Sequence, residues 1–209
     1  MIELWILFIS LGVLLVLTVL LLILYPKLHK NKFKKNFVSI YGKKVYRYAL
    51  HNDLYLINQL ELRGNDDQRL KVDHLLFGTK YIYLIKDYYL PGVIEAKEKD
   101  HSFIYKSSEK NSKKVYIDNP LIENKRLLKK VALNVGLNES LFISIVLLND
   151  DAELDNFVST SKDNFIVHLS SFNRLINQLE SRKVAPLNDN QLRYTVKDVN
   201  KLNVRNKKN

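Results

Sequence analysis

The 209-residue sequence has no cysteine and only six glycines. The lack of cysteine excludes a disulfide framework, a thiolate metal site and a cysteine nucleophile. The glycines are not spaced as a P-loop or a dinucleotide-binding fingerprint, and no serine lies in a G-x-S-x-G elbow. The five histidines are scattered without metal-ligand spacing, which argues against a zinc site. We therefore expect no nucleotide, zinc or other small-molecule cofactor.

Apolar material, by contrast, is plentiful. Apolar and aromatic residues make up 46% of the chain and charged residues 26%, which suits a folded core rather than global disorder. The length allows one domain of ordinary size with terminal segments and excludes two large domains. We expect an anchor at residues 1–25, a basic juxtamembrane linker at 26–36, a folded domain at 37–182, and a short helix with a basic tail at 183–209.

The longest apolar run extends from Leu4 to Tyr25 and contains no charge. At about 1.5 Å per residue it is about 33 Å long, the thickness of a bilayer core. It lacks the basic start and small-residue exit of a cleavable signal peptide. Eight lysines and arginines follow the run before the first acid, Asp53, whereas only Glu3 precedes it. The positive-inside rule then predicts a single-pass membrane protein with its N-terminus outside and its domain in the cytoplasm.

Periodicity predicts mainly strands in the first half of the domain and alternating elements in the second. We expect a short helix at 37–50 and strands at 54–62, 70–77, 80–85, 93–97, 102–106, 114–117, 142–148 and 165–167. Asn119 and Pro120 are a typical helix start, and further helices are expected after Ser170 or Ser171 and after Thr195. This order indicates an α/β (α+β) fold in which helices flank one mixed sheet.

The helix after Pro120 has an apolar stripe and a basic remainder. Its cations most simply form a solvated face of the helix. The formal charge of the whole chain is +11, and it falls to about +4 for the domain once the juxtamembrane cations and Glu3 are set aside. A mild surplus permits a phosphate-binding face without requiring one. If the domain contacts nucleic acid, we expect the contacts at Lys125, Arg126, Lys129 and Lys130.

A carboxylate opens an apolar strand in Val72-Asp73-His74-Leu75-Leu76, and a turn at Gly78-Thr79 leads into a return strand. In order and spacing, these features and the later helix start resemble the NERD, or nuclease-related, domain, a relative of the PD-(D/E)xK nucleases, over about residues 38–180. The resemblance implies one restriction-endonuclease-like domain. The matching positions are Asp73, Gly92, Asn119, Pro120 and Asn124, with Glu123 in place of the usual glutamine.

In that family, the aspartate and the acid of an E-x-K motif hold a divalent metal, and the lysine assists the attacking water. Without a gap, the two E-x-K positions fall on Lys86 and Tyr88. Lys86 puts a cation where the metal would be held, so we expect Asp73 and Lys86 to pair with each other. The resemblance therefore implies a catalytically degenerate member.

An alternative site is Ile94-Glu95-Ala96-Lys97, an E-x-K one strand later. Period two would put Glu95 and Lys97 on one face, so Glu95 could join Asp73 as a Mg²⁺ ligand; a chance match in a charged surface strand is the simpler interpretation. Three hypotheses follow: a degenerate membrane-anchored module that binds a protein or, weakly, nucleic acid; a metal-dependent nuclease with a displaced E-x-K; and a membrane-proximal structural or scaffold protein.

Overall fold

The structure is a computed structural model. It describes the backbone of residues 2–64 and 68–205, with side chains throughout except at residues 2–10, 23 and 26–31. The chain divides into two compact units, Met1–Ile40 and Tyr41–Asn209.

Helix α1 is continuous from Ile2 to His51 and contributes to both units. It includes residues 26–36, expected as a linker, and residues 37–50, expected as a separate short helix. No proline lies between residue 27 and the end of the helix, so the sequence contains no strong break there. The expected linker and short helix are therefore parts of one element.

The apolar side chains that the structure describes between Leu11 and Tyr25 are exposed. Within the described residues, however, no helix combines the length and the apolar character needed to cross a membrane. The structure thus gives no support to the span expected at residues 4–25. Residues 4–10 and 23 of that segment lie outside the described side chains.

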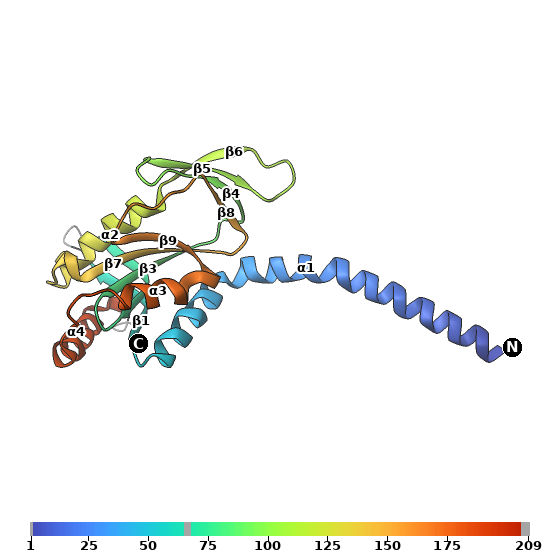
Figure 1. Ribbon diagram of the computed structural model, residues 1–209, viewed down its shortest axis with the longest axis horizontal. Helices are drawn as coiled ribbons and strands as arrows, with labels where there is room; N and C mark the ends of the chain where they lie inside the picture. The colour runs from blue at the N-terminus through green and yellow to red at the C-terminus, as the bar shows by residue number, and fades with distance from the viewer. Residues whose placement is uncertain (1, 65–67, 206–209) are drawn as a thin grey trace. The chain divides into compact units, whose positions relative to one another are not determined.

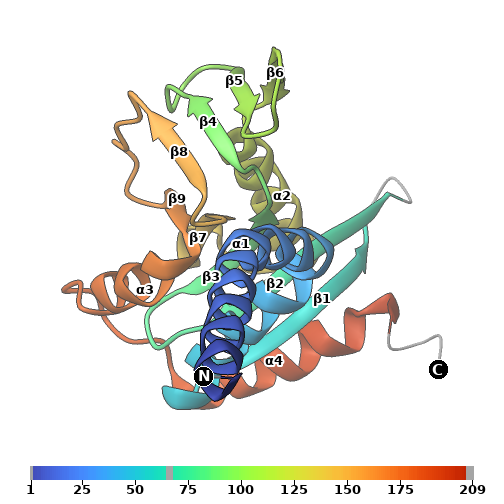
Figure 2. The ribbon, with the colours of Figure 1, turned by 90° about the vertical axis from the view of Figure 1, so that its right-hand side faces the viewer.

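The second unit contains two mixed sheets with flanking helices (Figures 1 and 2). The five-stranded sheet has the order β1-β2-β3-β7-β9, and the four-stranded sheet has the order β6-β5-β4-β8. The strands are β1 (Tyr55–Arg63), β2 (Arg69–Phe77), β3 (Ile82–Tyr88), β4 (Gly92–Glu95), β5 (Ser102–Ser107), β6 (Lys114–Asp118), β7 (Phe142–Leu148), β8 (Ala152–Asp155) and β9 (Asn164–His168). The helices that follow α1 are α2 (Pro120–Asn134), α3 (Phe172–Glu180) and α4 (Asp189–Leu202).

The expectation of one mixed sheet is wrong because two neighbouring strands bend together. β3 and β7 pair in parallel, and after a short break the same chain segments pair again as β4 and β8. Pro91 cannot donate a ladder hydrogen bond at the break. There the Leu90 N–H donates to Asn149 Oδ1 at 2.7 Å, and the Gly92 N–H donates to the Asp151 carbonyl at 3.1 Å. The break divides the described strands into two sheets and produces β8, which was not predicted from the sequence.

The core of the larger sheet lies under two helices that are far apart in the sequence. Leu128 and Val131 of α2 and Leu192 and Val199 of α4 pack with buried residues of β1, β2 and β3. A second cluster, centred on Ile94, joins the smaller sheet to β7 and the start of α2. Helix α2 therefore contributes residues to both cores.

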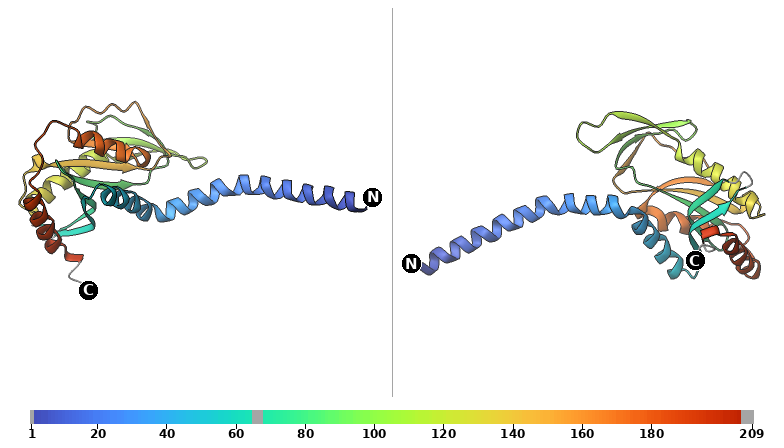
Figure 3. Two further views of the ribbon diagram at one scale, coloured as in Figure 1. Left: turned by 60° about the horizontal axis from the view of Figure 1, so that its bottom comes forward. Right: turned by 180° about the vertical axis from the view of Figure 1, so that it is seen from behind.

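Helix α4 packs along β1 (Figure 3). It begins at Asp189, where Asn188 caps two backbone N–H groups, and not after Thr195 as expected, because the Asn188 cap comes earlier in the chain. Beyond its end, Asn203 Oδ1 accepts the Glu61 N–H at 3.2 Å. The outer edge of β1 is thus partly covered by the C-terminal segment.

Candidate functional site

The hairpin of β2 and β3 carries the residues that the sequence analysis selected first. Asp73 lies in the middle of β2 rather than at its start, and the antiparallel register places it beside Lys86 on β3. Lys86 Nζ lies 3.2 Å from Asp73 Oδ2, and the same oxygen accepts the Asp87 N–H at 3.0 Å. Both side chains keep a fifth to a third of their surface exposed. The expected pairing of Asp73 with Lys86 is confirmed.

A second pair on this hairpin is buried and was not predicted. His74 Nε2 lies 2.9 Å from Asp87 Oδ2, and His74 Nδ1 lies 2.7 Å from Asn58 Oδ1 on β1. Burial raises the pKa of Asp87, although the hydrogen bond from His74 opposes this effect. His74 and Asp87 therefore form a buried hydrogen-bonded pair, and the His74 ring links β2 to both neighbouring strands.

Tyr88 occupies the position at which the resemblance implies a lysine, and it contacts helix α2. Its hydroxyl donates to Glu123 Oε2 at 2.8 Å. Burial, followed by the hydrogen bond to Glu123, raises the pKa of Tyr88. Two of the three departures from the pattern that the resemblance implies, Tyr88 and Glu123, therefore contact each other through one hydrogen bond.

The remaining motif residues at the start of α2 have architectural roles. Asn119 is the N-cap, and its Oδ1 accepts the Leu121 N–H at 2.9 Å while Pro120 occupies the first turn. The buried Asn124 amide donates to the carbonyl of Leu84, to Ser144 Oγ and to the carbonyl of Ile145. The side chain of Asn124 thus joins α2 to β3 and β7 next to the hairpin.

Gly92 begins β4 at the bend between the two sheets. Its φ is +133°, and a Cβ at this position would lie 2.2 Å from the Lys106 carbonyl oxygen and 2.7 Å from the Ser108 nitrogen. Only glycine tolerates both the conformation and the close approach of the neighbouring backbone. The glycine of the motif is therefore required by the bend.

A divalent metal, which the resemblance implies, does not fit the residues present at the hairpin. Mg²⁺ takes an octahedral set of oxygen ligands. Asp73 supplies one carboxylate, but its partner is the ammonium group of Lys86, and Asp87 is buried and hydrogen-bonded to His74. Over the described part of the chain, no three or more His, Cys, Asp or Glu side chains gather in a way that could hold a metal ion.

The displaced E-x-K does not form the expected strand face. β4 ends at Glu95, so Lys97 lies beyond it and is exposed, and the expected strand at 93–97 is too long. Glu95 forms an ion pair with Lys114 of β6. β4 belongs to the four-stranded sheet and Asp73 to the five-stranded sheet. Glu95 is thus engaged within its own sheet.

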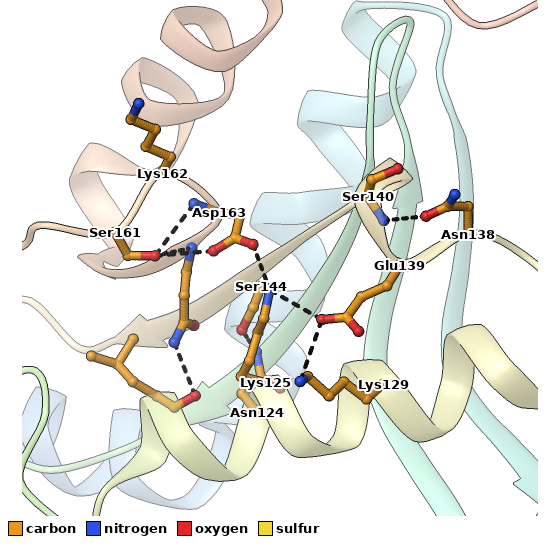
Figure 4. Close-up of polar contacts among 12 residues, drawn as sticks. Asn124, Lys125, Lys129, Asn138, Glu139, Ser140, Ser144, Ser161, Lys162 and Asp163 are labelled. Carbon is orange, nitrogen blue, oxygen red and sulfur yellow. Dashed lines mark hydrogen bonds and ion pairs between the residues drawn. The ribbon is translucent and has the colours of Figure 1, made fainter.

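Two of the four cations of α2, Lys125 and Lys129, are engaged by acids of neighbouring segments (Figure 4). Lys125 Nζ forms a hydrogen-bonded ion pair with Asp163 at 2.5 Å and lies 3.5 Å from Glu139, which is also 3.9 Å from Lys129 Nζ. Burial raises the pKa of Asp163, but hydrogen bonds from Lys125 and Ser161 outweigh it, so the net shift is downward.

The other two cations of the basic face, Arg126 and Lys130, differ from Lys125 and Lys129. Lys130 Nζ donates to Gln68 Oε1 at 3.2 Å, and Arg126 is exposed. The basic face predicted from the sequence is therefore less positive than its composition implies.

Three comparisons with known proteins place this geometry in context. The model of the family described as NERD, nuclease-related domain, matches residues 32–149, more than half of the chain. No curated protein matches the sequence. A solved structure described as a protein of unknown function, AF1548, is 10% identical, with 80% of this chain and 96% of that chain covered and a TM-score of 0.34. On the family match, the chain belongs to the NERD, nuclease-related domain, family.

Proposed function

We propose that this chain is a NERD domain without nuclease activity, which acts as a binding module at the cytoplasmic face of a membrane. The observation that carries the proposal is the 3.2 Å ion pair between Lys86 and Asp73. The resemblance implies that the Lys86 position holds an acid that shares a metal with the aspartate. An ammonium group there repels a divalent cation and already neutralises the aspartate.

The surroundings of the hairpin also argue against a phosphate ligand. Tyr41 is buried, and its hydroxyl donates to the Tyr88 carbonyl at 3.1 Å. Burial raises the pKa of Tyr41, and the negative charges of Asp87 and Asp150 raise it further. The exposed carboxylate of Asp150, close enough to act on Tyr41, would repel a nucleic-acid backbone here.

Any contact with nucleic acid is therefore assigned to the α2 face, and we expect it to be weak and independent of sequence. Lys125 and Lys129 already have acidic partners. Arg126 and Lys130 are the α2 cations that keep their charge available to a phosphate. Each phosphate contact that is removed reduces the salt dependence of binding by about one unit of the logarithmic slope.

Attachment to a membrane through residues 4–25 is part of the proposal. This segment has no charge, and its described apolar side chains are exposed to an extent that suits contact with lipid. The cations after residue 25 predict that the domain faces the cytoplasm. Alkaline carbonate should leave the full chain in the membrane fraction, and protease added to intact cells should leave the domain intact; degradation from outside would reverse the proposed orientation.

A cleavage assay tests the loss of activity. The full chain is incubated with DNA and RNA in a titration of Mg²⁺ and Mn²⁺, beside Asp73→Ala, Glu95→Ala and Lys86→Ala. We expect no cleavage above the level of Asp73→Ala. Metal-dependent cleavage that disappears in both Asp73→Ala and Glu95→Ala but survives in Lys86→Ala would instead establish the displaced E-x-K site.

A further inference from the structure

Strand β6 is an outer strand of the four-stranded sheet and pairs only with β5 among the described strands (Figures 1 and 2). Four of its five residues are exposed, and Tyr116 has 77% of its surface accessible. The outer edge of β1, by contrast, lies against α4. An exposed edge offers unpaired N–H and C=O groups to another strand.

The sequence of β6, Lys114-Val115-Tyr116-Ile117-Asp118, is complementary to itself in one antiparallel register. If Tyr116 lies opposite Tyr116 of a second copy, Lys114 lies opposite Asp118, and Val115 lies opposite Ile117. Two-fold symmetry repeats the pairs Lys114–Asp118 and Val115–Ile117, whereas the Tyr116 pair lies on the axis and occurs once. Shifting each strand by one residue separates both lysines from both aspartates.

The geometry of the sheet is compatible with this register. Residues 114, 116 and 118 share one face, and residues 115 and 117 share the other. Residues that share a face also point their N–H and C=O groups to the same edge of the strand. Every pair in the register joins residues of the same face, so the outward N–H and C=O groups of one strand meet those of its partner. The apolar face of β6 continues the second core described above, since Ile117 and Tyr105 pack against the cluster that contains Ile94 and Phe103. Val115, 48% exposed, would be covered by Ile117 of the second copy.

We propose that this chain forms a symmetric dimer by antiparallel pairing of β6 with β6 of a second copy, centred on Tyr116. The contact joins two four-stranded sheets into one continuous sheet. It does not depend on the hairpin of β2 and β3 or on the proposed function. Because β6 has five residues, the dimer is weak and depends on concentration.

Charge reversal tests the occupant of the edge. In the full chain in detergent, Lys114→Asp alone and Asp118→Lys alone each place like charges opposite each other twice per dimer. Each change should raise the dissociation constant measured by sedimentation about 10- to 100-fold. The double variant Lys114→Asp/Asp118→Lys should restore the dimer, and the two single variants should form a mixed dimer when combined.

The mixed sample also controls for folding, because Lys114 forms an ion pair with Glu95 that Lys114→Asp removes. If the two single variants associate when they are mixed, both must be folded, because a misfolded protomer could not form the mixed dimer. Equally strong association of the unchanged protein, both single variants and the double variant would assign self-association to another part of the chain and overturn the proposal. Absence of association in the unchanged protein would also overturn it, and would leave the edge to a strand of a different protein.

Cross-linking tests the register, since the chain has no cysteine. Tyr116→Cys places two thiols across the symmetry axis, where directly opposite Cβ atoms are about 5 Å apart. Mild oxidation should convert this variant to a covalent dimer much faster than Leu133→Cys or Val158→Cys, whose native side chains are similarly exposed, at 73% and 72%. Equal rates for the three variants would refute the register.

Discussion

Replacing Lys86 by glutamate should create a response to divalent metal that the unchanged protein lacks. Lys86 Nζ lies 3.2 Å from Asp73 Oδ2. A carboxylate at this position would be close to that of Asp73, and the two together would attract a hard cation. If the ammonium group of Lys86 excludes a metal ion from Asp73, this one substitution should let the site bind one.

The size of the effect follows from the geometry of the pair. Two like charges about 4 Å apart repel by about 4 kcal/mol near a protein surface. Because both side chains are partly exposed, solvent screening reduces the cost for Lys86→Glu to about 1–2 kcal/mol of unfolding free energy. If the new site binds Mg²⁺ with a dissociation constant of about 1 mM, a concentration of about 10 mM restores roughly 1.4 kcal/mol. This corresponds to about 3–6 °C in the melting temperature of a chain of this size.

Thermal unfolding followed by circular dichroism measures this response. The full-length unchanged protein, Lys86→Glu and the uncharged control Lys86→Gln are melted with and without MgCl₂, with KCl added to match ionic strength. Only Lys86→Glu should be stabilised, and Asp73→Asn in the same background should abolish the effect. Equal stabilisation of the unchanged protein, or no response of Lys86→Glu, would refute the idea that Lys86 takes the place of a metal.

Three further predictions concern the residues around the hairpin. Gly92→Ala should destabilise the domain by roughly 3 kcal/mol or more in urea unfolding, because the new Cβ meets backbone atoms and the φ is unfavourable; a loss below about 1 kcal/mol would contradict the described bend. Asn124→Leu should cost about 2–4 kcal/mol in the same assay, since buried hydrogen bonds to β3 and β7 are lost. Burial raises the pKa of Asp87 above its usual 3.8, so the folded state binds this proton more tightly. Protonation of Asp87 therefore contributes to the free energy of unfolding, fully below about pH 3.8, and this contribution is lost as the pH rises through the folded pKa. Asp87→Asn should remove this part of the pH dependence of stability. An unchanged pH profile would show that Asp87 does not titrate in this way.

The local part of the site could be predicted from the sequence. The family resemblance placed Asp73 and Lys86 at two positions of one site on neighbouring strands of a hairpin, and this was enough to pair them. In this register His74 lies opposite Ile85, and Asp87 is its diagonal neighbour on the same face, two residues further along β3. The pair of His74 and Asp87 was missed because the histidines were considered only as metal ligands.

The bend between the sheets and the start of the last helix depend on distant segments. Pro91 and Gly92 mark a turn in one strand, but the matching break after β7 is held by Asn149, more than 50 residues later. No local pattern shows that the two breaks coincide. The cap at Asn188 was overlooked in favour of Thr195, since both residue types cap helices and only packing against β1 selects between them.

The docking of α4 on β1 also bears on how the chain is made. Leu192 and Val199 complete a core whose strands β1 to β3 leave the ribosome more than 100 residues earlier, and Asn203 binds the edge of β1 last of all. During synthesis, β1 is therefore an open edge with uncovered apolar residues until the C-terminal helix emerges. A nascent or prematurely terminated chain presents that edge to chaperones and to neighbouring chains, and its yield should depend on how quickly the last helix arrives.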